Sequence, residues 1–331
     1  MKDLEIEDIQ LVAELPYKWD KLSNKTLLIS GASGFIGSFI CNVIEYRNKV
    51  YHQNIKIISL TRRGGIETNT ITHKKIDISQ PFIIREKIDY VLHLASNTHP
   101  AQYADDPIGT ITTNIFGCDN LLKIAKDNNA RFLLASSVEI YGNGDAKPMD
   151  EKYCGYIDCN SARSGYNESK RVCESLAQAY KLKYDVDVVI ARLARVFGAD
   201  RKKDTKAMAQ FIDKIVEGND IVLKSKGLQR FSYCYIADAA SGIIEILLSG
   251  NNGEAYNIAA DDDGLTLGDY AGYLARKSDK NVIFQIEDNQ SVSKSIYALL
   301  DTSKLKLLGW KPLFSIKEGL ERTLRIKSIN N

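Results

Sequence analysis

The sequence predicts an α/β fold built on a doubly wound parallel sheet, with a smaller, interleaved region in the C-terminal half. Short runs rich in Ile, Val and Leu lack the alternation of half-exposed strands, which is typical of strands buried on both faces. These runs cover residues 26–30, 55–60, 90–95, 131–136 and 186–193. Segments with helical periodicity, at 35–48, 106–128 and 164–184, separate most of them. A repeated alternation of strand and helix favours a doubly wound sheet.

The regular alternation weakens after about residue 198. A strand leading into a helix is predicted over 233–250, and a short strand over 255–259. Amphipathic helices are predicted at 206–219, 266–278 and 315–328. Residues 1–24 precede the first strand and are expected to form an extra helix or arm.

Composition excludes several classes of protein. The chain has 331 residues and a formal net charge of +2, too small to indicate a nucleic-acid or membrane surface. No run approaches the length of a membrane span, and the acidic N-terminus does not resemble a signal peptide. Six scattered cysteines and four histidines show no metal-ligand spacing. We therefore expect a cytoplasmic protein with reduced thiols and no metal site.

Three glycines follow the first buried strand. Gly31, Gly34 and Gly37 in "LLISGASGFIGSF" lie between that strand and the following helix. Glycines at this place permit a tight turn and let backbone N–H groups approach a pyrophosphate. The pattern favours a dinucleotide site, and a purely structural turn is the alternative.

The end of the second strand bears on which dinucleotide binds. It carries Thr61, Arg62 and Arg63 in place of the carboxylate that usually holds the ribose of NAD. An arginine there suits the 2′-phosphate of NADP. Asp77 is a candidate adenine contact, and a solvated turn is the alternative for it. The residues alone favour NADP over NAD.

These observations divide the chain. We predict an N-terminal extension over 1–24, a Rossmann-type dinucleotide-binding domain over 25–198 plus roughly 230–260, and a substrate-binding region from 199–229 and 261–331.

A tyrosine and a lysine lie four residues apart in "SARSGYNESKRVCES". Tyr166 and Lys170 would fall on one face of a helix, and Ser137 and Glu139 follow the buried strand in "LLASSVEIYG". Ligands bind at such carboxyl ends of strands, so all four side chains could meet in one cleft. A packed core tyrosine and an ordinary charged helix face are the alternatives. Glu168 and Arg171 are expected to be ordinary surface residues.

The chain resembles the extended short-chain dehydrogenase/reductases that modify nucleotide sugars, over about residues 25 to 325. The motifs that carry the resemblance are "GASGFIG", "HLAS", "TNIFGCDNLLKIA", "ASSVEIYG", "YNESKR", "YIAD" and "LGWKP". The most similar branch holds the UDP-glucuronate decarboxylases and dTDP-glucose 4,6-dehydratases. That branch implies bound NAD, which leaves the choice between NAD and NADP open.

The resemblance implies roles for the site residues. Tyr166 would be the base that takes a proton from a sugar hydroxyl, and Lys170 and the cofactor would lower its pKa. Ser137 would hydrogen-bond the same sugar oxygen. The implied cofactor-binding residues are Gly31, Ser33, Gly34, Phe35, Ile36, Gly37, Arg62, Asp77, Ile78, Leu94, Ala95, Ser96, Asn114, Tyr166 and Lys170.

The residues after Ser137 bear on the reaction. In the family's dehydratases an Asp–Glu pair follows this position, and the Asp protonates the departing hydroxyl. Here Val138 replaces the Asp while Glu139 remains. Valine cannot donate a proton, so the resemblance favours decarboxylation over dehydration. A surface or ion-paired carboxylate is the alternative for Glu139.

The substrate side departs from the family pattern. Arg195 replaces an asparagine, Phe231 replaces an arginine that contacts the diphosphate, and Arg230 precedes it. Arg195 and Arg230 are expected to supply the missing charge. Arg163 matches a decarboxylase arginine, and Thr98 and Tyr103 fall where the family builds part of the sugar pocket.

Two functions remain open at this point. The first is oxidation at sugar carbon 4 followed by decarboxylation or a related rearrangement, with 4,6-dehydration as a less favoured variant. The second is reduction or epimerisation of a keto sugar or keto-polyol linked to a nucleotide, and "TRR" and the altered arginines favour it. A catalytically dead binding module would be expected to lack Tyr166 or Lys170. The family resemblance also implies a homodimer.

Overall fold

Seven parallel strands form one sheet in the order β11-β6-β5-β4-β1-β2-β3. The computed structural model describes residues 4–96, 105–144, 147–161, 164–200, 206–286 and 297–329. The strands are β1 (Thr26–Ser30), β2 (Lys56–Thr61), β3 (Ile71–Lys75), β4 (Tyr90–His93), β5 (Arg131–Ser137), β6 (Val188–Leu193) and β11 (Ala255–Ile258). The predicted doubly wound parallel sheet is therefore confirmed.

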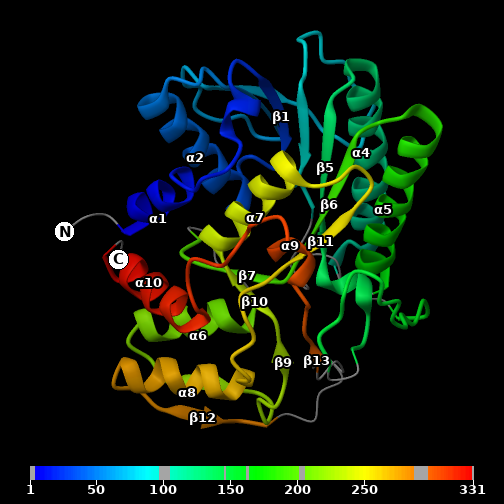
Figure 1. Cartoon of the computed structure of the whole chain (residues 1–331). Helices are drawn as coiled ribbons and strands as arrows, with labels where there is room; N and C mark the ends of the chain where they lie inside the picture. The colour runs from blue at the N-terminus through cyan, green and yellow to red at the C-terminus, as the bar shows by residue number, and fades with distance from the viewer. Residues whose placement is uncertain are drawn as a thin grey trace.

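Helices cover both faces of the sheet (Figure 1). One face packs against α2 (Phe35–Tyr51) and α7 (Ile236–Ser249), and the other against α4 (Pro107–Asn128) and α5 (Ser164–Tyr184). Successive strand residues point to opposite faces, so Leu27 joins the first core and Leu28 the second. This two-sided burial explains why the strands read as continuous apolar runs. Within the described ranges, no helix is both long and apolar enough to cross a bilayer.

The N-terminal extension contains α1 (Leu4–Ala13) and the short 3₁₀ helix η1 (Trp19–Leu22). Asp8 on α1 is buried, and it accepts hydrogen bonds from Arg322 Nε at 2.7 Å and from the Tyr235 hydroxyl at 2.5 Å. Arg322 lies on α10 (Ile316–Ile329) and Tyr235 on β10 (Tyr233–Tyr235). The first and last helices therefore lie against each other, as Figure 1 shows.

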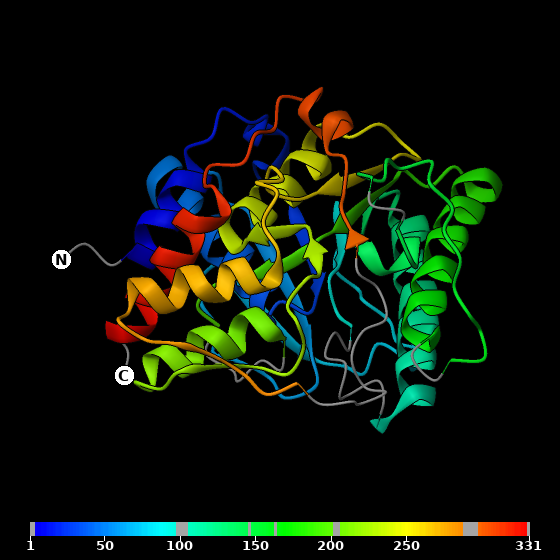
Figure 2. The same cartoon turned by 90° about the horizontal axis from the view of Figure 1, so that it is seen from below.

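The C-terminal region lies beside the carboxyl ends of the sheet strands (Figure 2). Its helices are α6 (Ala207–Val216), α8 (Leu267–Lys277), α9 (Ser303–Lys306) and α10. Three pairs of short parallel strands join it: β7 (Arg195–Phe197) with β10, β8 (Ile221–Leu223) with β12 (Val282–Phe284), and β9 (Arg230–Phe231) with β13 (Tyr297–Ala298). The pair formed by β7 and β10 continues directly from β6 and so connects this region to the sheet.

The sequence-based boundaries agree best where an element is long and buried. The predictions of 26–30 and 164–184 match β1 and α5 residue for residue. The edge strand β3 was not among the predicted apolar runs, because its sequence "ITHKK" has a single buried residue. The two- and three-residue strands β7, β8, β9, β12 and β13 are too short to create a periodic pattern, whereas β10 and α7 match the strand and helix predicted over 233–250.

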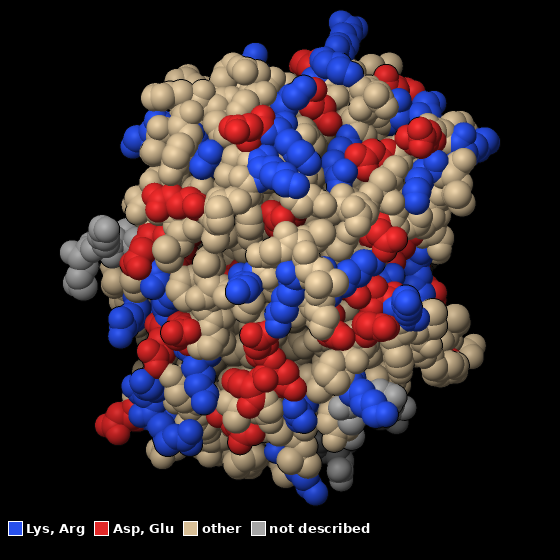
Figure 3. Space-filling view, viewed as in Figure 1, with Lys and Arg blue, Asp and Glu red and all other residues tan. Residues whose placement is uncertain are grey.

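Charged side chains are mixed over the face of the molecule viewed in Figure 3. Lysines and arginines alternate with aspartates and glutamates there, in keeping with the net charge of +2. This face therefore carries no extended field of one sign.

Candidate active site

The glycine loop between β1 and α2 is packed too tightly for any larger residue. Gly31 has φ +80°, and a Cβ there would lie 2.7 Å from the backbone nitrogen of Ala95. A Cβ on Gly37 would lie 2.1 Å from the Gly31 carbonyl oxygen. Gly34 caps the N-terminus of α2, and its N–H donates to the Gly31 carbonyl at 2.9 Å. The loop leaves the amide groups at the start of α2 open to an anion, as a pyrophosphate site requires.

The loop lies at the switch point of the sheet. The strand order reverses beside β1 and β4, and the carboxyl ends of both strands meet there. Leu94 follows β4, and its N–H donates to the Ser30 carbonyl at 3.0 Å. Ser96 Oγ donates to Asn114 Oδ1 at 2.9 Å, and Asn114 Nδ2 donates to Ser169 Oγ at 2.9 Å. A hydrogen-bonded chain thus runs from the end of β4 through α4 to α5.

The end of β2 shapes the other side of the candidate dinucleotide site. Arg62 and Arg63 are exposed directly after β2. Asp77 is also exposed, and hydrogen bonds from Ser79 hold the pKa of its carboxyl below the usual range, with a smaller effect of the Arg62 charge. Ile78 is buried against Gly117, so its side chain belongs to the core.

Tyr166 and Lys170 lie one turn apart on α5, and both are buried. Lys170 Nζ donates to the carbonyl of Ala135 on β5 at 2.9 Å. Burial lowers the pKa of Lys170, and the nearby Cys173, Cys118 and Glu174 act in the opposite direction. The helix therefore holds its lysine directly against the strand that ends at Ser137.

Ser137 ends β5 and caps the 3₁₀ helix η2 (Val138–Tyr141). Its Oγ accepts the N–H of Glu139 at 3.2 Å. Asn167, next to Tyr166 on α5, donates to the Glu139 carbonyl at 3.0 Å. α5, which carries Tyr166 and Lys170, therefore contacts the segment that carries Ser137 and Glu139.

His93, at the end of β4, belongs to the same buried region and was not among the predicted site residues. Its Nδ1 shares a 2.8 Å hydrogen bond with Ser30 Oγ, and its Nε2 has no hydrogen-bond partner among the residues that the structure describes. Burial lowers the pKa of His93 to about 3, and the charge of Lys170 adds to the effect. The imidazole is therefore neutral near pH 7. The signal available in the sequence was its place at the end of a buried strand.

Glu139 forms an ion pair with Arg195, the first residue of β7. Arg195 Nη2 lies 3.3 Å from Glu139 Oε1, and the guanidinium carbon lies 3.7 Å from the centre of the Phe231 ring. Arg195 Nη1 is buried and has no hydrogen-bond partner within the described part of the chain. Arg230 is paired with Asp262 at 2.7 Å. Of the two arginines expected to bind phosphate, Arg195 is the one that is paired with Glu139, two residues after Ser137.

Other sequence-based assignments differ in outcome. Thr98, Tyr103 and Arg163 lie outside the described residues. The expectation that Arg171 is an ordinary surface residue is wrong: it is half-buried and donates to the carbonyls of Ile140 and Gly155 at 2.7 Å and 2.6 Å. In the described part of the chain, no group of three His, Cys, Asp or Glu side chains is arranged to hold a metal ion.

A glycine loop at the switch point of a parallel sheet, together with a buried Tyr–Lys pair on α5, is typical of an enzyme of the Rossmann class that uses a nicotinamide dinucleotide. The profile of the NAD dependent epimerase/dehydratase family matches residues 27–259. The chain belongs to this family, whose members depend on NAD or NADP.

Individual relatives are similar over most of their length. UDP-glucuronic acid decarboxylase 3 of Arabidopsis thaliana is 30% identical over 307 residues, which are 90% of this chain and 87% of the relative. UDP-glucuronic acid decarboxylase 1 of Danio rerio is 28% identical over 338 residues, 98% of this chain and 78% of the relative. The crystal structure of a dTDP-glucose 4,6-dehydratase from Streptomyces venezuelae, solved with NAD bound, superposes with a TM-score of 0.78 at 24% identity. The superposition covers 92% of this chain and 97% of the dehydratase chain, and it shows that the two proteins share a fold.

The residues present fit a nicotinamide dinucleotide. The close packing of Gly31 and Gly37 keeps side chains away from the N-terminus of α2, where a pyrophosphate binds in this fold. Ser96 and Asn114 are linked by hydrogen bonds to Ser169 on α5, the neighbour of Lys170 in the chain. The assignment of these residues to the cofactor site remains a prediction, and the link through Ser169 is visible only in the fold.

Proposed function

We propose that this protein is a nucleotide-sugar decarboxylase, which oxidises carbon 4 of a nucleotide-linked uronic acid transiently and then releases the carboxylate as CO₂. The observation that carries the proposal is the segment Ser137–Glu139, which contacts α5 beside Tyr166 and has a valine between the serine and the glutamate. Val138 is buried among core residues, so no proton donor stands at this position. The similarity to two UDP-glucuronic acid decarboxylases over nine-tenths or more of the chain supports the same reaction.

The catalytic roles follow from the placement of the side chains. Tyr166 takes the proton of the carbon 4 hydroxyl, and Ser137 holds that oxygen by a hydrogen bond. Lys170, fixed on the Ala135 carbonyl, places its charge one helical turn from Tyr166. Bound NAD or NADP would supply the hydride acceptor of the oxidation and, after CO₂ has left, the hydride that restores the carbon 4 hydroxyl, so that no cofactor is consumed.

Decarboxylation needs no acid at the position of Val138. Once carbon 4 is a ketone, the bond to the carboxylate breaks, and its electron pair moves toward the carbonyl oxygen that Ser137 and Tyr166 hold. A proton must then be added to carbon 5. Glu139, two residues after Ser137, is the candidate that donates this proton or orients a water molecule. Elimination of a hydroxyl would instead require a donor to the leaving oxygen.

One observation favours a second function. Glu139 is paired with Arg195, and its carboxylate would have to leave this ion pair to reach carbon 5 of a sugar. Reduction of a nucleotide-linked keto sugar, or epimerisation at carbon 4, uses Tyr166, Lys170 and Ser137 and has no need of Glu139. The exposed Arg62 and Arg63 would also suit the NADPH of a reductase.

Product analysis separates these functions. Purified protein is incubated with UDP-glucuronate and NAD, and separately with other nucleotide sugars, and the products are identified by mass spectrometry. We expect loss of one CO₂ from UDP-glucuronate, with no net consumption of cofactor. Loss of water would indicate dehydration, and gain of two hydrogens with consumption of NADPH would indicate a reductase. Tyr166→Phe should lower the rate by about 10²-fold or more, and full activity in this variant would contradict the assignment of the base.

A further inference from the structure

The turn that bears the catalytic serine and glutamate is a weak element taken alone. η2 spans four residues, Val138–Tyr141; the Glu139 N–H donates to Ser137 Oγ and the Gly142 N–H donates to the Glu139 carbonyl, both at 3.2 Å. Single 3₁₀ turns have poor hydrogen-bond geometry and depend on their surroundings. The position of Ser137 relative to Tyr166 therefore depends on what holds η2 from outside.

One face of α5 supplies most of these contacts. Asn167, Lys170, Arg171 and Glu174 are spaced by three, one and three residues, which places them on a single helical face. Asn167 donates to the Glu139 carbonyl and Lys170 to the Ala135 carbonyl. The face that carries the catalytic lysine is thus also the face that contacts the segment around Ser137.

Arg171 joins η2 to a neighbouring loop. Its Nε donates to the Ile140 carbonyl at 2.7 Å, and its Nη2 donates to the Gly155 carbonyl at 2.6 Å. Gly155 packs so closely that a Cβ there would lie 1.8 Å from the Tyr141 carbonyl oxygen. One guanidinium therefore clamps both the end of η2 and the loop that lies against it.

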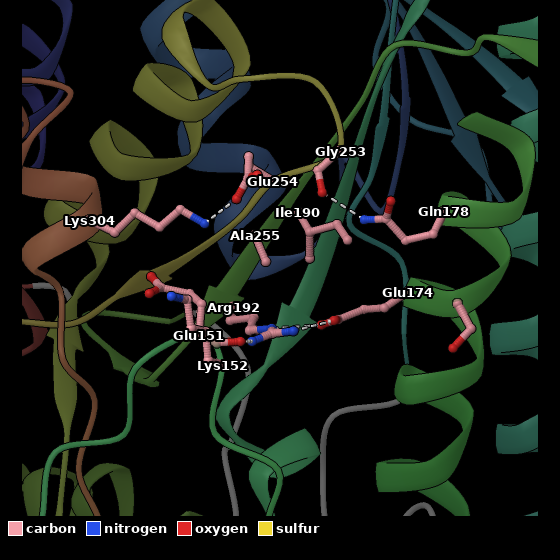
Figure 4. Close-up of a pocket in the computed structure, with 11 residues that line it drawn as sticks. Glu151, Lys152, Glu174, Gln178, Ile190, Arg192, Gly253, Glu254, Ala255 and Lys304 are labelled. Atoms are coloured by element: carbon pink, nitrogen blue, oxygen red, sulfur yellow. Dashed lines mark hydrogen bonds and ion pairs between the residues drawn. The ribbon is translucent and has the colours of Figure 1, made fainter. Parts of the chain in front are cut away.

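Arg192, on β6, secures the same turn from the other side. Its Nε and Nη2 donate to the two carboxylate oxygens of Glu174 at 3.1 Å and 2.7 Å, as Figure 4 shows. Its Nη1 donates to the Tyr141 hydroxyl at 2.9 Å and to the Glu151 carbonyl at 2.8 Å. Tyr141 is fully buried and donates in turn to Asn257 Oδ1 at 2.7 Å. The arginine thus ties α5, β6 and η2 together through one planar group.

The environment makes this second clamp rigid. The side chains of Arg192 and Glu174 are each 12% exposed, and the pair raises the pKa of Arg192 above its ordinary value. Both line a pocket of about 340 Å³ between α5 and α9, whose floor includes Ile190 and Ala255 (Figure 4). A bidentate pair with little solvent contact holds its geometry better than an exposed pair.

We propose that Arg171 and Arg192 are positioning residues that hold the Ser137–Glu139 turn in register with Tyr166. The inference rests on the proposed roles of Ser137 and Tyr166, and neither arginine touches the reacting atoms in this scheme. Loss of either clamp would let η2 move while the glycine loop, on the other side of β4, keeps its structure. The expected result is a slower chemical step with unchanged cofactor binding.

The test compares Arg171→Met, Arg192→Met and the conservative Arg171→Lys with Arg131→Met. Arg131 is a matched control, because it is also a half-buried arginine with an ion pair, to Asp187 at 2.7 Å, but it lies at the opposite end of β5. Amide hydrogen exchange of the peptide spanning residues 137–142 is measured with saturating cofactor. We expect exchange to accelerate by about tenfold or more in Arg171→Met and Arg192→Met, and to be unchanged in Arg131→Met.

A kinetic measurement with UDP-glucuronate accompanies the exchange. In the two clamp variants kcat should fall by about 10- to 100-fold while KM and the cofactor Kd stay within about threefold, and Arg171→Lys should recover part of the rate. Unchanged exchange in both Met variants would overturn the proposal, as would accelerated exchange with unchanged kcat. If the wild-type protein does not decarboxylate UDP-glucuronate, the proposed function fails, whereas the exchange measurement still decides whether the arginines hold the turn.

Discussion

The guanidinium carbon of Arg195 lies 3.7 Å from the centre of the Phe231 ring, although the two residues belong to different short strands, β7 and β9. An arginine stacked on an aromatic ring is held in place without losing its hydrogen-bonding edge. The Phe231 side chain therefore serves as a platform that fixes a positive charge beside Glu139.

Replacement of Arg195 by Asn should weaken binding of UDP, the probe for the nucleotide diphosphate, by about 10- to 100-fold, because a charged hydrogen bond contributes about 1.5–3 kcal/mol. In the double variant Arg195→Asn/Phe231→Arg, the new arginine lies next to position 195 in the fold. It should therefore recover much of the lost affinity for UDP. Calorimetric titration with UDP measures both effects. Arg195→Lys keeps the charge and serves as the control. Equal UDP affinity in the wild type and Arg195→Asn would show that Arg195 acts on Glu139 alone.

The glycine loop should not tolerate even a methyl group at Gly37. A Cβ there would lie 2.1 Å from the Gly31 carbonyl oxygen, so the loop must shift. Gly37→Ala should raise the Kd of NAD and NADP by at least about tenfold, measured by fluorescence titration. Gly272→Ala is the matched control on helix α8, where a Cβ would meet the flexible end of Arg276 at 3.3 Å. A tight cofactor complex in Gly37→Ala would place the dinucleotide elsewhere.

Arg62 should decide between the two cofactors. It directly follows β2, at the place where this fold holds the adenosine ribose. Arg62→Ala should raise the Kd of NADP by about tenfold and leave that of NAD nearly unchanged, since only NADP carries the 2′-phosphate. Arg63→Ala controls for the loss of one positive charge. Equal effects of Arg62→Ala on both cofactors would argue against NADP selection at this site.

Asp238 should make the fold less stable as the pH rises. Burial raises the pKa of its carboxyl from 3.8 to about 7, backbone hydrogen bonds from Leu313 and Phe314 oppose the rise, and the nearby Asp8 and Glu318 add to it. The folded state thus binds the proton more tightly than the unfolded state. The free energy of unfolding should therefore fall as the pH rises from 3.8 to about 7.

Asp238→Asn keeps an oxygen for the Leu313 N–H and cannot ionise. Urea titrations should show that the free energy of unfolding of this variant, minus that of the wild type, increases from about pH 5 to about pH 8. A constant difference between the two proteins over this range would mean that Asp238 stays ionised in the folded state.

The N-terminal helix should contribute measurably to stability through Asp8. The carboxylate is 1% exposed and accepts bonds from Arg322 and Tyr235. Asp8→Ala should lower the free energy of unfolding by about 3 kcal/mol, at the lower end for a broken buried pair, because Glu7 remains 3.5 Å from Arg322. Urea denaturation measures the change, and Glu7→Gln should cost less than about 1 kcal/mol, because the Glu7 side chain is 37% exposed while that of Asp8 is 1% exposed. Equal losses in the two variants would contradict the role of Asp8.

Much of the site could be predicted from sequence because each part occupies a fixed place relative to a long, buried element. Gly31, Gly34 and Gly37 come directly after β1, and Ser137 ends β5. The four-residue spacing of Tyr166 and Lys170 needs only helical geometry to bring them to one face. Local periodicity and the end of a strand are properties of the chain itself, so the parallel sheet, the glycine loop and the tyrosine–lysine pair could all be located without a structure.

The remaining features depend on contacts between distant segments. Arg195 meets Glu139 and Phe231, and Arg171 reaches Ile140 and Gly155, across separations that no local pattern encodes. An arginine reads as a surface residue in sequence because its charge is ordinarily solvated. Whether it is solvated or held in place depends on which carbonyls and carboxylates the fold brings within hydrogen-bond distance, and these come from segments far apart in the sequence.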